Sequence, residues 1–469
     1  MTQRTKRERI LDRTRPPKAG PAGKVSFPRY FERRLRNGFK VFVVENHSLP
    51  IVTVGFVVKS GSAMDGDLPG LASVTSELLT KGTARRSAVQ IAEDIDFVGG
   101  SLSSTASWDG SQIFVSVLKA HLGKGFDILQ DIILNPSFPP EEIERLRVQR
   151  IASILQMKAE PSYLADITFS AIVFKNHPYG KPAGGTEESV SAMKRDDFVT
   201  FHRNYYTPGN SFIVFAGDIN AAEAGKLALK YFAKWKGNKA PTTIDPPKLN
   251  GAADTAVIVD KPGAVQSVVR IGHVGIARNN KDFIKISVMN TLLGGYFSSR
   301  ININLREVHG YTYGGGSVFD ARLAPGGFEV RADVRNEVTT ETIEEIYREL
   351  RKIRSTLPTK EEMRMVKSYL SGLFPIQLET PQQVAGRVVA IELYGLPKNY
   401  YGNYRRNIQR ITAADIRAVA KKYIHPEKLT VVVSGNSKEI ASSIGRGRAV
   451  MIVNSDGKEI GSTHHGEAK

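Results

Sequence analysis

The stretch DFVTFHRNYYTPGNSFIVFAGD, Asp197–Asp218, recurs 218 residues later as DIRAVAKKYIHPEKLTVVVSGN, Asp415–Asn436. Aspartate, tyrosine, proline and glycine fall at matching positions in both stretches, and the apolar run FIVF superposes on TVVV. A second pair, PPEEIERLRVQRIASIL from Pro139 and PTKEEMRMVKSYLSGLF from Pro358, repeats at nearly the same spacing. Self-similarity at a fixed spacing indicates a duplicated architecture. We therefore interpret the chain as a tandem duplication.

Each copy mixes strand and helix patterns. Alternating or continuous apolar residues predict strands, and apolar residues at helical spacing predict helices. The predicted strands are 39–45, 52–59, 112–118 and 328–334. The predicted helices are 88–97, 122–134 and 340–353. We expect an α+β fold of two tandem homologous domains, each a largely antiparallel sheet with helices packed on one face.

The length and composition fit two globular domains. Single hydrophobic cores stop growing at about 250–300 residues, whereas this chain has 469 residues, 41% of them hydrophobic and 24% charged. Residues 236–253 are rich in Pro, Lys and Gly and are interpreted as a linker. The expected domains are 27–235 and 254–469, preceded by a basic disordered tail over 1–26.

The charge is strongly basic and there is no cysteine. The formal net charge is +18, and residues 1–24 carry eight Lys or Arg against Glu8 and Asp12. Such a leader could contact nucleic acid or an acidic surface. No aromatic side chains interleave with the charges, as base stacking requires, so we favour a solvated tail and rank nucleic-acid binding last. The lack of cysteine excludes disulfides, thiolate catalysis and zinc sites of the Cys type.

No export or membrane signal is evident. No apolar run reaches the about 20 residues that span a bilayer, and the basic amino terminus has no apolar stretch after it. We expect no membrane span and a cytoplasmic protein, with the periplasm as the alternative if a leader is missing from the start.

Five stretches together carry a family resemblance: LRNGFKVFVVENHSLPIVTVGFVVKSGSAMD (35–65), GLASVTSELLTKGT (70–83), NHPYGKPAGGTEESV (176–190), the YYTPGN segment, and LLGGYFSSRININLREVHGYTYGGGS (292–317). They resemble the pitrilysin and insulinase superfamily of zinc peptidases, especially the subunits of mitochondrial processing peptidase and their bacterial homologues. The resemblance implies the metallohydrolase fold of LuxS and the processing peptidases, in two similarly folded halves. It also implies pairs of subunits that close around a peptide chamber.

The metal-binding helix of that family is altered in this chain. In active members it reads G-x-A-H-x-x-E-H-x-x-F-K-G-T, where two histidines bind Zn²⁺ and the glutamate between them is the general base. Ser73 replaces the first histidine, Ser76 the glutamate and Glu77 the second histidine. Arg150 stands where the third ligand, a later glutamate, is aligned. Because neither a hydroxyl nor a guanidinium can replace a ligand of Zn²⁺, we expect no metal and no cofactor in this chain.

The second half of such proteins supplies substrate contacts through an L-R-E-x-x-G-x-x-Y segment. In NLREVHGYTYGGGS this arginine and tyrosine are Arg306 and Tyr313, and Tyr311 is the fallback for the phenol. A phenol can donate to an oxyanion developing at a peptide carbonyl, and a guanidinium can hold carbonyl or carboxylate oxygens. The alternative is an ion pair of Arg306 with Glu307 and a half-buried strand tyrosine at Tyr313. If this piece is a strand, Tyr311 and Tyr313 point to the same face.

These features lead to two hypotheses. In the first, the chain is the non-catalytic, substrate-binding subunit of a heterodimeric zinc metallopeptidase, active only with a homologous partner that brings Zn²⁺. The substrates would be unfolded peptides, aligned by adding a strand to an open sheet edge. In the second, the chain is an inactive scaffold like the core subunits of respiratory cytochrome complexes. The presence of both Arg306 and Tyr313 favours the first.

Overall fold

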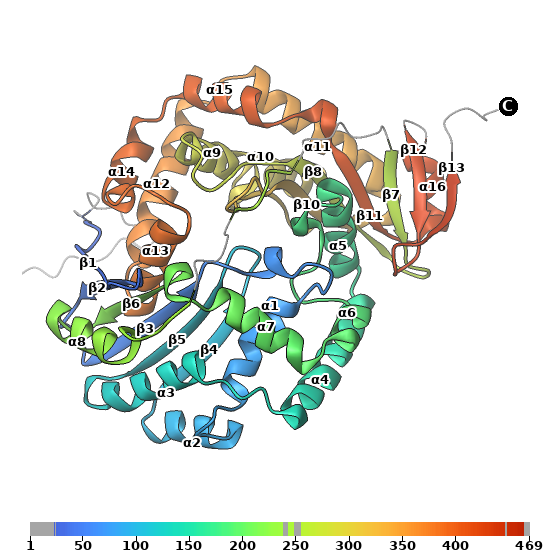
Figure 1. Cartoon of the computed structure of the whole chain (residues 1–469). Coiled ribbons are helices and arrows are strands. Elements are labelled where there is room, and N and C mark those ends of the chain that lie inside the picture. Colours follow the sequence, from blue (N-terminus) through green and yellow to red (C-terminus); the bar gives the residue numbers. More distant parts are fainter. Residues whose placement is uncertain (1–22, 24, 238–242, 248–254, 446–447, 464–469) are drawn as a thin grey trace, which may run out of the picture.

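Two β-sheets, one in each half of the chain, form the centre of the molecule (Figure 1). The computed structural model describes residues 23, 25–237, 243–247, 255–445 and 448–463, so the expected tail and linker lie largely outside the described residues. The strands of the first sheet, in spatial order, are β1 (Phe31–Arg34), β2 (Lys40–Glu45), β6 (Ser211–Gly217), β3 (Ile51–Val58), β5 (Ser111–Leu118) and β4 (Ser101–Ala106). Those of the second are β13 (Glu459–Thr463), β12 (Ala449–Val453), β7 (Thr255–Asp260), β11 (Thr430–Gly435), β8 (Gln266–Val274), β10 (Gly327–Arg335) and β9 (Gly315–Asp320).

The duplication is visible in the strand order. The order β2-β6-β3-β5-β4 in the first sheet corresponds to β7-β11-β8-β10-β9 in the second. Within these five strands one pair is parallel in each sheet, β2 with β6 and β7 with β11. The other pairs are antiparallel. The predicted α+β fold with two similarly built halves is therefore confirmed.

The helices also repeat. Those of the first half are α1 (Leu71–Leu78), α2 (Ala88–Phe97), α3 (Leu122–Leu134), α4 (Pro140–Ala159), α5 (Pro161–Phe174), α6 (Glu187–Ala192), α7 (Arg195–Tyr205) and α8 (Ala221–Phe232). Those of the second are α9 (Phe283–Asn290), α10 (Arg300–Asn302), α11 (Thr339–Ser355), α12 (Lys360–Ile376), α13 (Pro381–Leu393), α14 (Tyr400–Arg410), α15 (Ala413–Tyr423) and α16 (Ser437–Ile444). The seven predicted elements end within one or two residues of their expected bounds, because apolar periodicity marks each of them. In the part of the chain that the structure describes, no helix combines the length and apolarity needed to cross a bilayer.

Each sheet is covered on its second face by a helix from the other half. Helix α13 lies against β3 and β6 of the first sheet, whereas α5 lies against β8 and β11 of the second (Figure 1). Val384 and Val388 of α13 pack with Phe42, Val57 and Val214 in one apolar cluster. Fully burying an aliphatic side chain of this size stabilises a fold by about 1.5–3 kcal/mol. The exchanged helices therefore join the halves through core packing.

A buried polar contact adds to this connection. Tyr179 Oη donates a hydrogen bond to Asp109 Oδ1 at 2.6 Å, and Asp109 Oδ2 accepts from the Leu323 amide at 2.9 Å. The Ala324 amide donates to Tyr179 Oη at 3.1 Å. Asp109 and Tyr179 belong to the first half, and residues 323 and 324 belong to the second. Because unpaired polar groups at such a buried place are costly, these contacts favour one fixed arrangement of the halves.

Candidate functional site

Helix α1 carries three of the four positions that correspond to the zinc motif. It starts at Gly70, whose φ of +92° is a conformation that favours glycine. A Cβ at Gly70 would also lie 2.7 Å from the Gly185 backbone. The buried Asp65 carboxylate accepts from the Gly70 and Ala72 amides at 2.7 and 2.8 Å, which satisfies the free amides at the helix start. The frame of the helix is thus intact without the ligands.

The serines on α1 make ordinary structural contacts. Ser76 is 0% exposed, and its hydroxyl lies 2.7 Å from that of Ser104 on β4. Ser104 in turn donates to the Ser76 carbonyl at 2.6 Å. Ser73 is half-buried on the same helix. These contacts attach α1 to strand β4 at the edge of the first sheet.

Glu77 and Arg150 form an ion pair across this frame. Arg150 Nη2 on α4 lies 2.6 Å from Glu77 Oε2 on α1, with side chains 21% and 37% exposed. The positions aligned with the second and third zinc ligands are therefore adjacent in space. A permanent cation occupies one of them, and one carboxylate with a guanidinium beside it does not provide three ligands for Zn²⁺. No group of three or more His, Cys, Asp or Glu suited to a metal ion occurs among the described residues.

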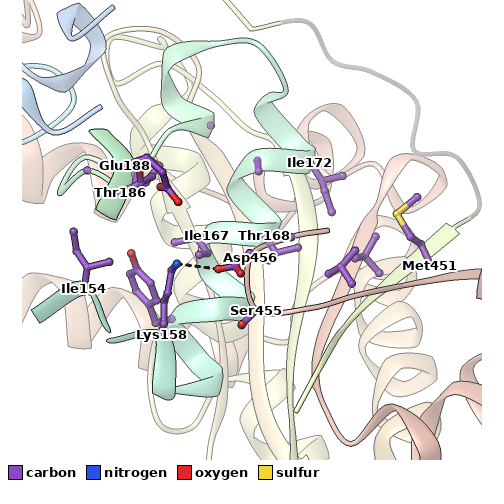
Figure 2. Close-up of a pocket in the computed structure, with 18 residues that line it drawn as sticks. Ile154, Lys158, Ile167, Thr168, Ile172, Thr186, Glu188, Met451, Ser455 and Asp456 are labelled. Atoms are coloured by element: carbon purple, nitrogen blue, oxygen red, sulfur yellow. Dashed lines mark hydrogen bonds and ion pairs between the residues drawn. The ribbon is translucent and has the colours of Figure 1, made fainter. Parts of the chain in front are cut away.

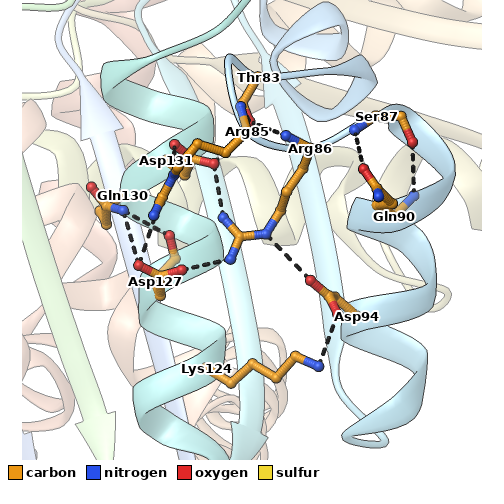
Figure 3. A network of polar contacts seen from close by, with 10 residues as sticks. All are labelled: Thr83, Arg85, Arg86, Ser87, Gln90, Asp94, Lys124, Asp127, Gln130 and Asp131. Atoms are coloured by element: carbon orange, nitrogen blue, oxygen red, sulfur yellow. Dashed lines mark hydrogen bonds and ion pairs between the residues drawn. The ribbon is translucent and has the colours of Figure 1, made fainter.

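A network of charges anchors the loop that follows α1 (Figure 3). Asp131 on α3 is 0% exposed and accepts hydrogen bonds from Thr83 at 2.8 Å, Arg85 at 3.0 Å and Arg86 at 2.8 Å. Arg86 also reaches Asp127 at 2.6 Å. Burial raises the pKa of Asp131, but the hydrogen bonds it accepts outweigh this effect and hold the pKa below its usual value. The network fixes the end of the zinc-type helix to α3.

A groove of about 730 Å³ lies beside this altered site. Residues from α1, α2, α4 and β4 line it, among them Glu77, Ile95, Leu102, Ser104 and Arg145. Among the described residues, strand β4 pairs only with β5, so its other side is an open edge there. An open edge presents backbone donors and acceptors to a further strand.

The segment with Arg306 and Tyr313 lies in the second half. Arg306 lies in a π-helical turn, Ile303–Val308, a feature that is frequent at functional sites. Its guanidinium lies 4.6 Å from the ring centroid of Phe297, which is itself 65% exposed, and Arg306 Nε lies 3.5 Å from Glu307. An exposed cation–π contact stabilises by about 0.5–1 kcal/mol. Arg306 is therefore held on an aromatic ring at the surface.

Tyr313 and Tyr311 differ in environment. Tyr313 is 93% exposed, whereas Tyr311 is half-buried against the second core and stacks on His309 with ring centroids 4.9 Å apart. Strand β9 begins only at Gly315, so this piece is not a strand and the condition for both tyrosines to share a face is not met. Gly310, with φ of +65°, allows the turn before them. Tyr313 is thus the more exposed of the two phenols.

The structure also shows a residue that the sequence did not indicate. The buried amide of Asn302 donates to the Phe297 carbonyl at 2.6 Å and accepts from the Gly315 amide at 3.0 Å. One side chain therefore holds both the aromatic residue under Arg306 and the backbone that follows Tyr313. The only signal in the sequence was a polar residue between two isoleucines in RININ.

Comparisons with known families agree with this geometry. Residues 40–187 match the family described as Insulinase (Peptidase family M16), and residues 192–370 match the Peptidase M16 inactive domain. An uncharacterized zinc protease of Mycobacterium leprae is 28% identical over 83% of this chain and 88% of its own length. A protein of Helicobacter pylori named a non-peptidase homolog is 25% identical over 86% of this chain and 94% of its own length.

Solved structures show the same fold. A peptidase M16 inactive domain from Pseudomonas fluorescens superposes with a TM-score of 0.83, at 25% identity, over 87% of this chain and 98% of its own. A protease from Helicobacter pylori superposes with a TM-score of 0.81, at 22% identity, over 87% of this chain and all of its own. The chain therefore belongs to the insulinase family of peptidases, family M16, as a member without the zinc motif.

Proposed function

We propose that this chain is the non-catalytic, substrate-binding subunit of a heterodimeric zinc metallopeptidase that cleaves unfolded peptides. It contributes Arg306 and Tyr313 to the active site of a homologous partner, and that partner supplies Zn²⁺ and the general base. The chain by itself has no peptidase activity and binds no catalytic metal.

The contrast between the two halves supports the proposal. In the first half, Glu77 and Arg150 neutralise each other at 2.6 Å, and Ser76 is buried against Ser104. In the second half, Tyr313 is 93% exposed and Arg306 lies on an exposed aromatic ring. Exposed large aromatic side chains beside a cation are typical of contact surfaces.

The substrate class follows from the edge of the first sheet. Strand β4 is open on one side, and the groove of about 730 Å³ lies along it. An extended peptide can pair with such an edge through its backbone, whatever its sequence, and its side chains enter the adjoining groove. An unfolded segment presents its backbone donors and acceptors along its whole length, so the proposed substrates are unfolded segments.

The test uses the full chain, alone and mixed with a similar-sized subunit that carries an intact H-x-x-E-H helix. A chain of this kind encoded next to this one is the first partner to test. We expect cleavage of an unfolded peptide by the mixture only, and loss of cleavage with a chelator. Arg306→Ala with Tyr313→Phe should lower kcat/KM of the mixture by about 10²–10³-fold, since one lost oxyanion donor costs that much.

Tyr311→Phe is the matched control. It removes the hydroxyl of a half-buried tyrosine two residues from Tyr313, and kcat/KM should stay unchanged. Full turnover of the mixture with Arg306→Ala and Tyr313→Phe would refute the site assignment. A stable mixed complex that cleaves nothing, with or without added Zn²⁺, would instead support an inactive scaffold, which the non-peptidase homolog among the relatives also brings into consideration.

A further inference from the structure

A second cavity lies at the junction of the two halves, between α5 and the carboxyl-terminal strands. It has a volume of about 320 Å³, and residues of both halves line it. The first half contributes the end of α4, one side of α5 and residues 180–188, and the second contributes β7, β12 and the turn over 455–457. Neither the altered zinc site nor the segment with Arg306 and Tyr313 takes part in it.

One end of the cavity is apolar (Figure 2). Helix α5 packs Leu164 and Phe169 onto the second sheet, and Ile167 and Ile172, which pack against the same apolar cluster, also line the cavity. An apolar helix of this kind is normally covered all round. Here Ile167 and Ile172 keep partial exposure, and Figure 2 shows Met451 on the same side as Ile172, so the apolar surface lacks a complete cover.

The other end is polar, and the charged side chains that line it, Lys158, Glu188 and Asp456, sum to one negative charge. Lys158 Nζ lies 2.6 Å from Glu187 and 2.9 Å from Asp456, so two carboxylates already neutralise this one ammonium. Glu188 also lines the cavity at an exposed position, and the charge of Lys158 contributes to lowering its pKa. Lys261 contacts the Lys158 carbonyl, and the charge of Lys458 contributes to lowering the pKa of Asp456. Neither lysine lines the cavity.

The hydroxyl groups at this end supply further hydrogen-bond partners. Tyr163, Thr168, Thr186 and Ser455 all line the cavity. Figure 2 shows Lys158, Thr186 and Glu188 together on one side of the cavity, opposite Ile172 and Met451. A ligand that matches both ends needs an apolar body and a cationic head that donates hydrogen bonds.

We propose that this cavity binds a primary amine carried on an apolar body. Its ammonium group lies between Glu188 and Asp456, and its apolar part covers Ile167 and Ile172. Because the lining comes from both halves, a bound amine would contact both α5 and β12 and stabilise their packing. The amine is either a free small molecule or the amino terminus of a peptide with an apolar first residue.

Calorimetric titration of the full chain with three matched probes tests the proposal. The probes are 2-phenylethylamine, 2-phenylethanol and 3-phenylpropionate, which share an aromatic body and differ in the head group. We expect saturable one-site binding of the amine, at least about tenfold tighter than binding of the alcohol, since hydrogen bonds to charged groups outweigh neutral ones. The carboxylate should bind weakest, because Glu188 and Asp456 repel it.

Three substitutions test whether the amine binds in this cavity. Ala171 lines it and is exposed on α5, so Ala171→Phe should fill the space and abolish binding of the amine. Ala414→Phe, at an exposed position on α15, is the matched control and should bind as the wild type does. Glu188→Gln should reduce the preference for the amine over the alcohol to less than about threefold.

A peptide pair identifies the source of the amine. Phe-Ala-amide and its acetylated form differ only in the terminal ammonium. Tighter binding of the free peptide than of 2-phenylethylamine assigns the cavity to peptide amino termini, and weaker binding assigns it to small amines. Equal affinity for the amine and the carboxylate, or unchanged amine binding by Ala171→Phe, would overturn the proposal.

Discussion

The altered zinc site in the first half and the segment over 297–313 in the second half differ in how their polar side chains are paired and exposed. Glu77 and Arg150 are paired with each other, and Ser76 is buried in a contact with Ser104. Tyr313 is almost fully exposed, and Arg306 rests on the exposed ring of Phe297. The first arrangement pairs its charges inside the chain, whereas the second leaves the phenol of Tyr313 exposed and holds Arg306 at the surface beside Phe297 and Glu307. This difference is why the proposed contribution to a partner comes from the second half.

The largest expected effect is a gain of metal by the first half. Ser73→His, Ser76→Glu, Glu77→His and Arg150→Glu together should give one equivalent of bound Zn²⁺ after dialysis, measured by elemental analysis. The helix would then present two imidazoles one turn apart, and α4 a third ligand in place of the cation. The same set without Arg150→Glu is the control and should retain much less Zn²⁺. No gain of Zn²⁺ in the fourfold variant would show that the four positions do not form the expected frame.

The next effect concerns the network that anchors the frame. Asp131→Asn should lower the free energy of unfolding by about 3 kcal/mol at neutral pH, because it leaves Arg85 and Arg86 without their buried charge partner. Asp96→Asn, at an exposed position on α2, should change it by less than about 0.5 kcal/mol. Urea unfolding measures both variants.

The same carboxylate predicts a pH dependence. The folded-state pKa of Asp131 is lowered, so its contribution is present above the unfolded pKa and is lost as the pH falls through the folded one. The deficit of Asp131→Asn should therefore shrink as the pH drops below about 4. A deficit that stays constant down to pH 3 would contradict this role of the charge.

A smaller effect separates the two tyrosines of the second half. Tyr311→Ala should cost about 1–2 kcal/mol of unfolding free energy, because the ring stacks on His309 and packs against the core. Tyr313→Ala should cost less than about 0.5 kcal/mol, since its ring is exposed. Equal losses in thermal or urea unfolding would mean that Tyr313 has a structural rather than a contact role.

The smallest effect is expected for the pair that replaces the metal ligands. Glu77→Gln should lower the free energy of unfolding by at most about 1 kcal/mol, and less in high salt, because the pair is partly exposed. A double-mutant cycle with Arg150→Gln isolates the coupling between the two side chains. A coupling well above this value would mean that the pair is a main support of the fold.

The fold was largely predictable from local patterns. Helices α2 and α3 and strands β2, β3, β5 and β10 each carry a complete apolar period, and the recurrence from Asp197 to Asp415 indicated the duplication. The exchange of α5 and α13 between the halves was not predictable. The apolar pattern of a helix indicates that the helix is buried, but it does not indicate which sheet the helix packs against. Likewise the ion pair of Glu77 with Arg150 depends on how α4 crosses α1.

The candidate site was likewise predictable from the sequence only in part. The sequence by itself determined which chemical groups are present, including the loss of both histidines and the presence of Arg306 and Tyr313 in one short segment. Only the tertiary structure decided that Tyr313 faces solvent while Tyr311 is held against the core, and that Asn302 ties Phe297 to Gly315. The physical reason is that residue types fix the charge and hydrogen-bonding capacity of a chain, whereas exposure and pairing depend on contacts between residues distant in sequence.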